Sequence, residues 1–386
     1  ASDVYKRQLV SVEIENHFAN IYKNLFNSVD DKDDLESVKN ELNYKINNCS
    51  LEEVDKVTAD KVKEATMHLK PNKSDPTFDF TSDCLKNASL MLFEHLKNVI
   101  KSFLNYGHIS MILLLATLVP LIKDKLANLC SSKNYRSIAI SSLILKIFDW
   151  LLILLFGESL GLDDLQFSYQ PNCSTNMCTW IIVETVNYFL KRDSEVFCCT
   201  MDMTKAFDLV RHSVLFRKLL DQGLPPIFIR LLLVMYALQE ANVRWNGSVS
   251  FKFSMSNGVK KGAVLTAILY CIYVNGLFQQ LRKNKTGCWV ENNFVGMVGY
   301  ADDNFLLSPT IGGLQEMLQI CEEYALKHGL KFSTDPIAKK SKTKCIAYLK
   351  DNRKLRKLVL CGNTLPWVND CKHLGNKVNI NMDGMK

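Results

Sequence analysis

Two apolar runs in this chain lead directly into aspartate, and this pairing constrains the possible fold more than any other feature. The first run is MVGYADDNFLL at residues 297–307, which places Asp302 and Asp303 side by side between segments typical of buried strands. Two interpretations are open at this point. Aspartate is common in turns, so the pair could close a hairpin. Clustered oxygen ligands are also what a divalent metal ion requires.

The second run supplies a third carboxylate from another part of the chain. EVFCCTMDM, at residues 195–203, is rich in β-branched and aromatic side chains, so we predict a strand that leads into Asp202. Carboxylates gathered without a cation repel one another and raise the pKa of at least one, so such a cluster is costly as mere scaffolding. We therefore predict that Asp202, Asp302 and Asp303 form one cluster on an antiparallel sheet facing an open cleft. Such a cluster could hold two cations roughly 3.5–4 Å apart.

The composition of the whole chain is that of a globular protein. It has 47% hydrophobic and 23% charged residues among 386, which argues against disorder. That length allows two or three domains, or one elaborated catalytic core. Of the two longest apolar runs, residues 111–122 are too few to span a bilayer, and residues 143–156 contain Lys146 and Asp149. We therefore expect no membrane association.

The cysteines indicate the redox environment. All thirteen are scattered, and none belongs to a CxxC pair, which argues against a zinc module and against a secreted disulfide framework. We therefore expect reduced thiols and an intracellular protein, with cytoplasm and nucleus both open.

Positive charge is concentrated near the C-terminal end. Residues 327–372 contain twelve Lys and Arg against three Asp, a balance of +9 that exceeds the whole-chain value of +7. A charged run is often only a solvated surface. An excess of this size after an acidic motif favours a polyanionic partner.

The order of helical and extended patterns indicates a mixed fold. Residues 1–8 (ASDVYKRQ) fit nothing downstream and resemble a translated sequencing adapter, so we set them aside as a scar. We predict a helical lead-in at residues 9–104, in which residues 84–104 form one amphipathic helix. A further helix is predicted at residues 174–192, opened by a Ser-Thr cap. Strands and helices then mix without a regular βαβ alternation, which indicates the α+β class.

Several segments, in their order and spacing, resemble the reverse transcriptases of non-LTR (LINE-type) retrotransposons. The four letters YADD alone are a weak match, whereas the ordered blocks together are specific. The resemblance covers roughly residues 60–380. The matching blocks are ATLVPLIKDK (116–125), KNYRSIAISSLILKIF (133–148), FSYQPNCST (167–175), MDMTKAFD (201–208), NGVKKGAVLTAILYCIYVNGL (257–277), YADD (300–303), GLKFSTDP (329–336), KSKTKCIAY (340–348) and CKHLGNKV (371–378).

The resemblance implies a right-hand polymerase of the α+β class, with fingers and a palm built on an antiparallel sheet. The reverse transcriptase domain would occupy residues 105–380, after the helical lead-in, and the thumb would be truncated. The implied activity is RNA-directed DNA polymerisation, in which dNTPs are transferred onto a primer 3′-hydroxyl. Its cofactors would be two Mg²⁺ ions, with Mn²⁺ as an alternative, and its partners would be an RNA template and a DNA primer.

The same resemblance assigns roles to individual residues. Asp202, Asp302 and Asp303 match the catalytic, metal-binding carboxylates, with Asp302 as a direct ligand of both cations and Asp303 as the supporting residue. Phe207 matches an aromatic gate that excludes the ribose 2′-hydroxyl, although a core aromatic is the alternative. The residues implied to bind the incoming dNTP, in which Lys123 and Arg136 would grip the triphosphate, are Lys123, Arg136, Lys205, Ala206, Phe207, Lys261 and Gly262.

Two departures from the family pattern leave rival functions open. Lys261 stands where the family usually has Gln, and Thr266-Ala267 stands where it usually has Ser-Pro. A lysine offers only donors and a point charge, so it does not reproduce the two-way hydrogen bonding of an amide. One rival is therefore a catalytically weak or inactive truncated relic that folds and binds nucleic acid. The other is a viral RNA-dependent RNA polymerase on the same palm, against which Phe207 argues.

Overall fold

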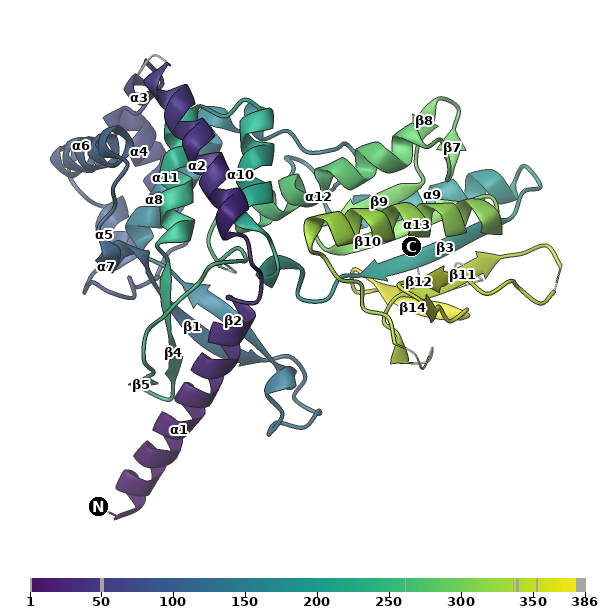
Figure 1. Ribbon diagram of the computed structural model, residues 1–386, viewed down its shortest axis with the longest axis horizontal. Helices are drawn as coiled ribbons and strands as arrows, with labels where there is room; N and C mark the ends of the chain where they lie inside the picture. Colours follow the sequence, from purple (N-terminus) through teal and green to yellow (C-terminus); the bar gives the residue numbers. More distant parts are fainter. Residues whose placement is uncertain are drawn as a thin grey trace. The chain divides into compact units, whose positions relative to one another are not determined.

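The chain folds into two compact units, each assembled from two stretches of sequence (Figure 1). The first unit comprises Ala1–Gly161 and Phe207–Leu269, and the second comprises Leu162–Ala206 and Tyr270–Lys386. The computed structural model describes residues 2–48, 52–260, 262–335, 337, 340–351 and 353–379. The boundaries predicted after residues 8 and 104 do not coincide with this division and remain predictions.

Helices precede the first strand in the first unit, and one predicted helix is divided in two. The prediction of a single helix over residues 84–104 is wrong, because the helix is interrupted between α5 (Ser82–Lys86) and α6 (Leu90–Tyr106). The Asn87 side chain donates to a carbonyl one turn back at 2.9 Å, and Ser89 takes an extended N-cap conformation. Asn and Ser compete for backbone hydrogen bonds, so they end one helix and begin the next. The other helices of this unit are α1 (Ser2–Leu25), α2 (Lys32–Asn47), α3 (Glu52–Asp55), α4 (Ala59–Met67), α7 (Met111–Leu114), α8 (Leu143–Phe156), α10 (His212–Asp221) and α11 (Pro226–Ala237).

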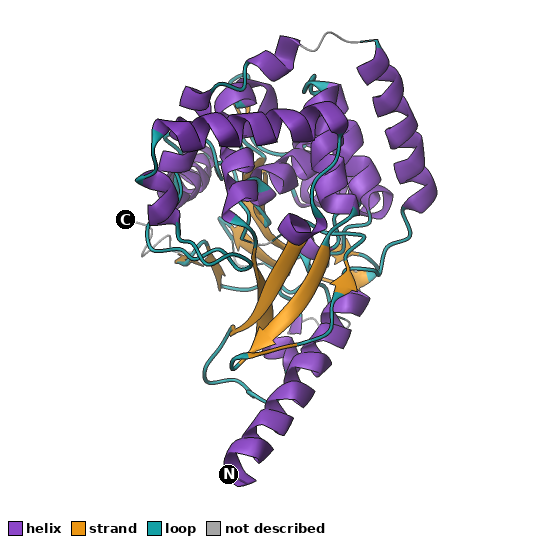
Figure 2. Cartoon of the chain, turned by 90° about the vertical axis from the view of Figure 1, so that its left-hand side faces the viewer, coloured by secondary structure: helices purple, strands orange, loops and turns teal. Residues whose placement is uncertain are grey.

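A mixed sheet forms the other part of the first unit. Its strand order is β2-β1-β4-β5, with β6 also paired to β4, and β1 runs antiparallel to β2 but parallel to β4. Helix α1 packs along the sheet (Figure 2), where the ring of Phe18 lies 5.5 Å from Trp245 and 5.1 Å from Tyr135, between centroids. These aromatic contacts bury the apolar side of α1 against the strands. The strands are β1 (Leu115–Ile122), β2 (Tyr135–Ile140), β4 (Glu240–Trp245), β5 (Ser248–Val249) and β6 (Phe253–Ser254).

The second unit is built on an antiparallel sheet in the order β11-β3-β10-β9. Helix α13 packs against β10 and β3, and α9 packs against β9 and β3 (Figure 1). Strand β3 is therefore deeply buried, and Phe197, Cys198 and Cys199 are each no more than 2% exposed. The elements are α9 (Thr175–Leu190), β3 (Val196–Asp202), most of α12 (Thr266–Lys283), β9 (Met297–Tyr300), β10 (Asp303–Ser308), α13 (Ile311–His328), β11 (Lys344–Tyr348), and the ribbons β7–β8 (Trp289–Val290, Asn293–Phe294), β12–β13 (Val359–Leu360, Asn363–Thr364) and β14–β15 (Asp370–His373, Asn376–Asn379).

These layers confirm the predicted α+β class, since helices pack on an antiparallel sheet without a repeating βαβ unit. The strand expected at residues 195–203 is β3, and the helix expected at residues 174–192 is α9. Ser174 caps α9 as predicted, because its side chain accepts a hydrogen bond from the Met177 amide.

The cysteines in the described part of the chain are all free thiols. None of the helices described here has the length and apolarity needed to cross a bilayer.

Candidate active site

The paired aspartates lie at the turn between β9 and β10, beside the end of β3. Strand β3 ends at Asp202 and β10 begins at Asp303, and the antiparallel register places these two residues directly opposite each other. Residues opposed in this way have Cβ atoms roughly 4.5–5.5 Å apart. Asp302 lies on the turn itself, after Ala301. The interpretation as a hairpin turn is therefore confirmed, and the same hairpin brings Asp303 opposite a third carboxylate, Asp202. The interpretation as a metal site stays a prediction.

The three acids affect one another electrostatically. Partial burial of its carboxyl, followed by the negative charges of Asp302 and Asp202, raises the pKa of Asp303 to about 6. This is the effect expected when carboxylates crowd together. The Asp202 carboxylate lies 3.9 Å from the ammonium of Lys342, at the outer limit of an ion pair, and solvent screens that contact because the Lys342 side chain is 73% exposed. A divalent cation would offset the remaining repulsion.

The donor set suits Mg²⁺, which prefers oxygen ligands and keeps several water molecules. In the described part of the chain, no three His, Cys, Asp or Glu side chains are gathered closely enough to form a complete metal-binding group. A complete cage of protein ligands is not required, because Mg²⁺ is usually held by one or two carboxylates together with substrate phosphates. Asp202 and Asp303 supply such a pair across the strands, and Asp302 adjoins it. The residues present therefore fit the ion.

Two of the residues predicted to bind dNTP lie together on the β1–β2 hairpin of the first unit. Lys123 follows β1 and its amide donates to the Asn134 carbonyl at 2.8 Å, while Arg136 on β2 is opposite Leu121. Arg136 lies on β2, and Lys123 comes directly after the end of β1 beside it. Both are exposed, and the Lys123 ammonium donates to the Lys133 carbonyl at 2.8 Å. The hairpin can therefore present two cations to an anionic group.

The residues that follow β3 differ in exposure. Lys205 is exposed and has a φ of +53°, whereas Ala206 is 3% exposed. Phe207 is half-buried, and its carbonyl accepts a hydrogen bond from the Val259 amide at 2.8 Å. Lys205 and Ala206 belong to the second unit and Phe207 to the first. The role of Phe207 as a gate stays a prediction.

Glycine is required at position 262 for steric reasons within the chain itself. Its φ is +119°, and a Cβ there would lie 2.3 Å from the carbonyl oxygen of Ala139. Another side chain would both strain the backbone and clash with β2. The part of Gly262 in dNTP binding stays a prediction. Lys261, the departure from the family pattern, lies outside the described residues.

A protein-family comparison decides what these residues belong to. The model described as "Reverse transcriptase (RNA-dependent DNA polymerase)" matches residues 122–375, which is more than half of the chain. The chain belongs to this reverse transcriptase family. The matched residues include β3 with Asp202, the YADD hairpin and Gly262.

Known relatives of this reverse transcriptase come from retrotransposable elements. The "Retrovirus-related Pol polyprotein from type-2 retrotransposable element R2DM" of Drosophila melanogaster is 25% identical over 205 residues, which are 53% of this chain and 19% of that protein. The corresponding type-1 element R2 protein of Bradysia coprophila is 28% identical over 213 residues, 54% of this chain and 23% of that protein. The chain therefore spans about a fifth of the length of these curated relatives. The predicted membership among non-LTR reverse transcriptases is confirmed.

Solved structures also include a similar chain. The apo telomerase of Candida tropicalis, truncated from its C-terminal domain, is 14% identical, with a TM-score of 0.49, and the similarity covers 82% of this chain and 62% of that one.

Two residues that contact the turn of the YADD hairpin were missed by the sequence analysis of this reverse transcriptase. Gln166 and Ser168 are fully buried, and both accept a hydrogen bond from the Ala301 amide. Ser168 fell within one of the family-like blocks, but no pattern in that block distinguishes it from its neighbours. Neutral polar side chains carry no charge signal, so only their tertiary contacts identify them.

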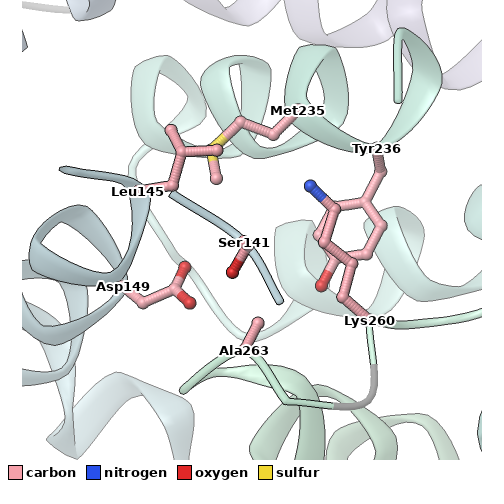
Figure 3. Close-up of a pocket in the computed structure, with 7 residues that line it drawn as sticks. All are labelled: Ser141, Leu145, Asp149, Met235, Tyr236, Lys260 and Ala263. Atoms are coloured by element: carbon pink, nitrogen blue, oxygen red, sulfur yellow. The ribbon is translucent and has the colours of Figure 1, made fainter. Parts of the chain in front are cut away.

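A small cavity in the first unit, lined by both polar and apolar side chains, was also missed (Figure 3). It has room for about one water molecule, and it contains the buried side chains of Lys260 and Asp149, which are 4% and 5% exposed. Burial lowers the pKa of Lys260 to about 8 and raises that of Asp149 to about 6, and the opposite charge of each partly offsets the shift of the other. Asp149 also accepts a hydrogen bond from the Val264 amide at 3.1 Å, which ties α8 to the segment before α12. The residues lining the cavity are Ser141, Leu145, Asp149, Met235, Tyr236, Lys260 and Ala263.

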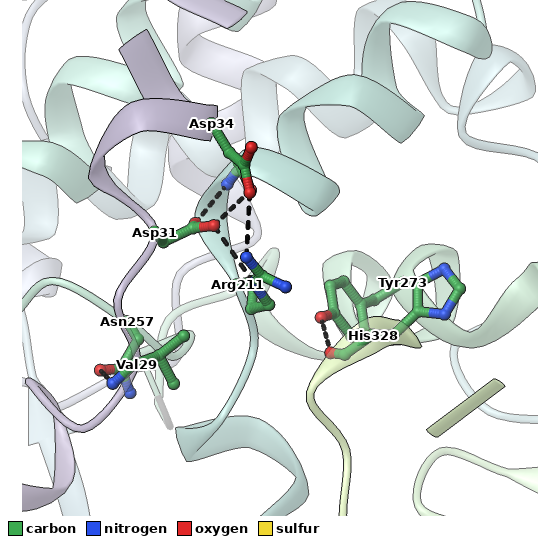
Figure 4. Close-up of polar contacts among 8 residues, drawn as sticks. Val29, Asp31, Asp34, Arg211, Asn257, Tyr273 and His328 are labelled. Carbon is green, nitrogen blue, oxygen red and sulfur yellow. Dashed lines mark hydrogen bonds and ion pairs between the residues drawn. The ribbon is translucent and has the colours of Figure 1, made fainter. Parts of the chain in front are cut away.

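Ionic contacts attach the start of α2 to the rest of the first unit (Figure 4). Asp31, which is 6% exposed, precedes α2 and accepts hydrogen bonds from the Ser213 amide at 2.8 Å and from Arg211 Nε at 3.2 Å. Arg211 also pairs with Asp34 at 3.0 Å. A buried carboxylate satisfied by several donors is costly to disrupt, so these contacts hold α2 beside α10.

Proposed function

We propose that this chain catalyses RNA-templated addition of deoxynucleotides to a primer 3′-hydroxyl, using Asp202, Asp302 and Asp303 to hold two divalent cations. The observation that supports this most directly is the register of β3 and β10, which sets Asp202 opposite Asp303. Membership of the reverse transcriptase family supports the same chemistry. Mg²⁺ is the proposed ion because all three ligands are carboxylates, and Mn²⁺ is the alternative.

The chain's own groups divide the task between binding and orientation. When bound, the cations would activate the primer hydroxyl and stabilise the leaving pyrophosphate. Asp302 and Asp202 would hold them, and Asp303 would support the site with its neighbouring carboxyl. Lys123 and Arg136 would bind triphosphate oxygens, where the planar guanidinium forms paired hydrogen bonds.

The nucleic acid and the sugar are recognised by other parts of the chain under this proposal. The template–primer would be bound partly by the Lys and Arg of residues 327–372, through contacts with phosphates that are independent of sequence. Phe207 would exclude ribonucleotides by occupying the space of the 2′-hydroxyl. Replacement of Phe207 by Val should then admit ribonucleotides.

Primer extension by the purified chain tests the proposal. The parent should extend a primer on an RNA template with Mg²⁺, and Asp302→Asn should reduce single-turnover extension roughly 10³-fold, because it removes several kcal/mol of charge stabilisation. Asp221→Asn, a matched change at an exposed aspartate on α10, should leave the rate unchanged. Equal rates for the parent and Asp302→Asn would refute the proposed metal site.

The inactive relic is the alternative that the sequence leaves open, because Lys261 stands where a Gln is usual. A Lys261→Gln variant should extend primers roughly 10²–10³-fold faster than the parent if one oriented contact is missing, by analogy with loss of an oxyanion donor. Equal single-turnover rates for the two proteins would remove the main support for the relic.

A further inference from the structure

The turn that carries Asp302 contains a residue in an unfavourable backbone conformation. Ala301 has a φ of +56°, in the left-handed region, and its residue surface is only 7% exposed. Residues with a Cβ avoid this region unless the surrounding structure holds them there. The direction in which the chain presents Asp302 therefore depends on whatever holds Ala301.

Two buried side chains hold the Ala301 amide. Its N–H is 2.8 Å from Gln166 Oε1 and 2.9 Å from Ser168 Oγ. The Ser168 hydroxyl donates to Gln166 Oε1 at 2.8 Å, which leaves an oxygen lone pair to accept from Ala301. The Gln166 amide group donates to the Ala301 carbonyl at 3.4 Å. Gln166 thus contacts both polar groups of the same backbone residue.

The backbone around Gln166 is joined to β9 as well. The Phe167 amide donates to the Gly299 carbonyl at 2.8 Å, and the Gly299 amide donates to the Leu165 carbonyl at 2.8 Å. A Cβ at Gly299 would lie 3.2 Å from Gln166 Nε2 and 2.6 Å from Asn304 Oδ1. Glycine at position 299 therefore leaves the space that the Gln166 side chain needs to reach the turn.

The segment that carries Gln166 is itself anchored to α12. Asp163 accepts two hydrogen bonds of 2.8 Å from the guanidinium of Arg282, a paired geometry that fixes orientation. The Asp163 amide donates to Asn275 Oδ1 at 2.7 Å. The supporting side chains thus belong to a segment that is fixed at its beginning, so they can impose a geometry on the hairpin.

We propose that Gln166 and Ser168 are positioning residues, which hold Ala301 in its left-handed conformation and thereby set the direction of the Asp302 carboxylate toward the cations. This inference rests on the proposed function of Asp302. The two supports are neutral, so they orient the carboxylate without adding a charge that would compete with it.

The test uses Gln166→Met, which keeps the length of the side chain but removes both of its hydrogen bonds to Ala301. Binding of Mn²⁺ to the full chain with a dideoxy-terminated primer, its RNA template and dNTP is followed by electron paramagnetic resonance of free Mn²⁺. We expect Mn²⁺ affinity to fall at least fivefold and single-turnover extension to fall roughly 10–100-fold, since small misplacements at a reacting centre have effects of that size. The matched control is Gln239→Met, a buried glutamine of the first unit that donates to the Met255 sulfur, and it should change neither measurement.

Rescue distinguishes positioning from a general loss of stability. Glycine adopts a positive φ without strain, so adding Ala301→Gly to Gln166→Met should restore most of the Mn²⁺ affinity. Unchanged Mn²⁺ affinity in Gln166→Met, or a loss that Ala301→Gly does not reverse, would overturn the inference. If Gln166→Met does not fold, Ser168→Ala removes a single acceptor and is judged by the same criteria.

The same measurements show whether the proposed function itself has failed. If Asp302 does not hold the cations, Asp302→Asn would bind Mn²⁺ as tightly as the parent does. Hydrogen exchange of the Ala301 amide would still show whether Gln166 holds the turn, because that amide should exchange faster in Gln166→Met and at the parent rate in Gln239→Met. An Ala301 amide that exchanges equally in both variants would count against any hold by Gln166.

Discussion

The YADD hairpin of the second unit and the segment before α12 in the first unit are both held by buried polar side chains, but the two supports differ in charge. Gln166 and Ser168 are neutral and satisfy the Ala301 amide directly. Asp149 and Lys260 are ionisable. Burial raises the pKa of Asp149 and lowers that of Lys260, which favours the neutral form of each. A neutral support costs little to desolvate once its hydrogen bonds are made, whereas a buried charged pair carries a penalty for each ion.

This difference follows from what each support holds. The hairpin carries Asp302 and Asp303 beside Asp202 of β3, and burial and the charges of these neighbours raise the pKa of Asp303 to about 6. A further charge beside it would change that balance, so a neutral amide and hydroxyl are suited to the position. The segment before α12 carries no such cluster, and a carboxylate there can accept from the Val264 amide while it opposes Lys260.

The largest effect on stability should come from breaking the charged support. Lys260→Met removes the larger of the two lysine charges that stabilise the buried Asp149 carboxylate, so the free energy of unfolding at pH 7.5 should fall by about 3 kcal/mol. Urea unfolding followed by circular dichroism measures this. The loss should be smaller at pH 5, where Asp149 can take up a proton.

The double variant Asp149→Asn with Lys260→Met is the control for that prediction. It removes both charges and keeps an acceptor for the Val264 amide, so its stability should lie within about 1 kcal/mol of the parent. A double variant as unstable as Lys260→Met alone would mean that packing, rather than the unpaired charge, causes the loss.

The dependence of stability on pH should separate the two supports. The pKa of Asp149 is raised from 3.8 to about 6 in the folded protein, so between these values the folded state holds more protons than the unfolded state. The parent should therefore lose stability relative to Asp149→Asn as pH rises from about 4 to 6, by roughly 2 kcal/mol. Chemical unfolding of both proteins across this range measures the difference.

The neutral support provides the contrast. The stability difference between the parent and Gln166→Met should be the same at pH 4.5 and pH 7, because neither Gln nor Met titrates. A difference that changes with pH would show that Gln166 is coupled to the neighbouring carboxyls, and the proposed distinction between the supports would fail.

The smallest expected effect concerns the surface of the second unit. Replacing Lys340 and Lys344 by Gln should reduce the slope of log affinity against log salt by roughly 1–2 for binding to a template–primer. Replacing Lys39 and Lys45 of α2 by Gln is the control with equal loss of charge. Equal slopes for the two variants would show that the basic C-terminal segment does not follow the nucleic acid.

Much of the site can be predicted from local pattern. A strand rich in β-branched and aromatic residues that ends at Asp202, and an apolar hairpin interrupted by Asp302 and Asp303, were visible in the sequence because strand signals span only a few residues. The break between α5 and α6 was not visible in the sequence. Asn87 and Ser89 end one helix and begin the next, although the apolar spacing continues through them. Apolar periodicity reports which side is buried and does not show where a cap interrupts the helix.

The amino-acid sequence by itself determined the acidic strand ends, the cap at Ser174 and the family to which the chain belongs. Only the tertiary structure decided which side chains support those acids. Gln166 bonds to Ala301, and the charge of Lys260 acts on the pKa of Asp149, across separations in sequence that no local period connects. A buried polar group without a hydrogen-bond partner lowers the stability of the folded state, so buried polar groups are paired. Which partner is available depends on how the helices and strands pack.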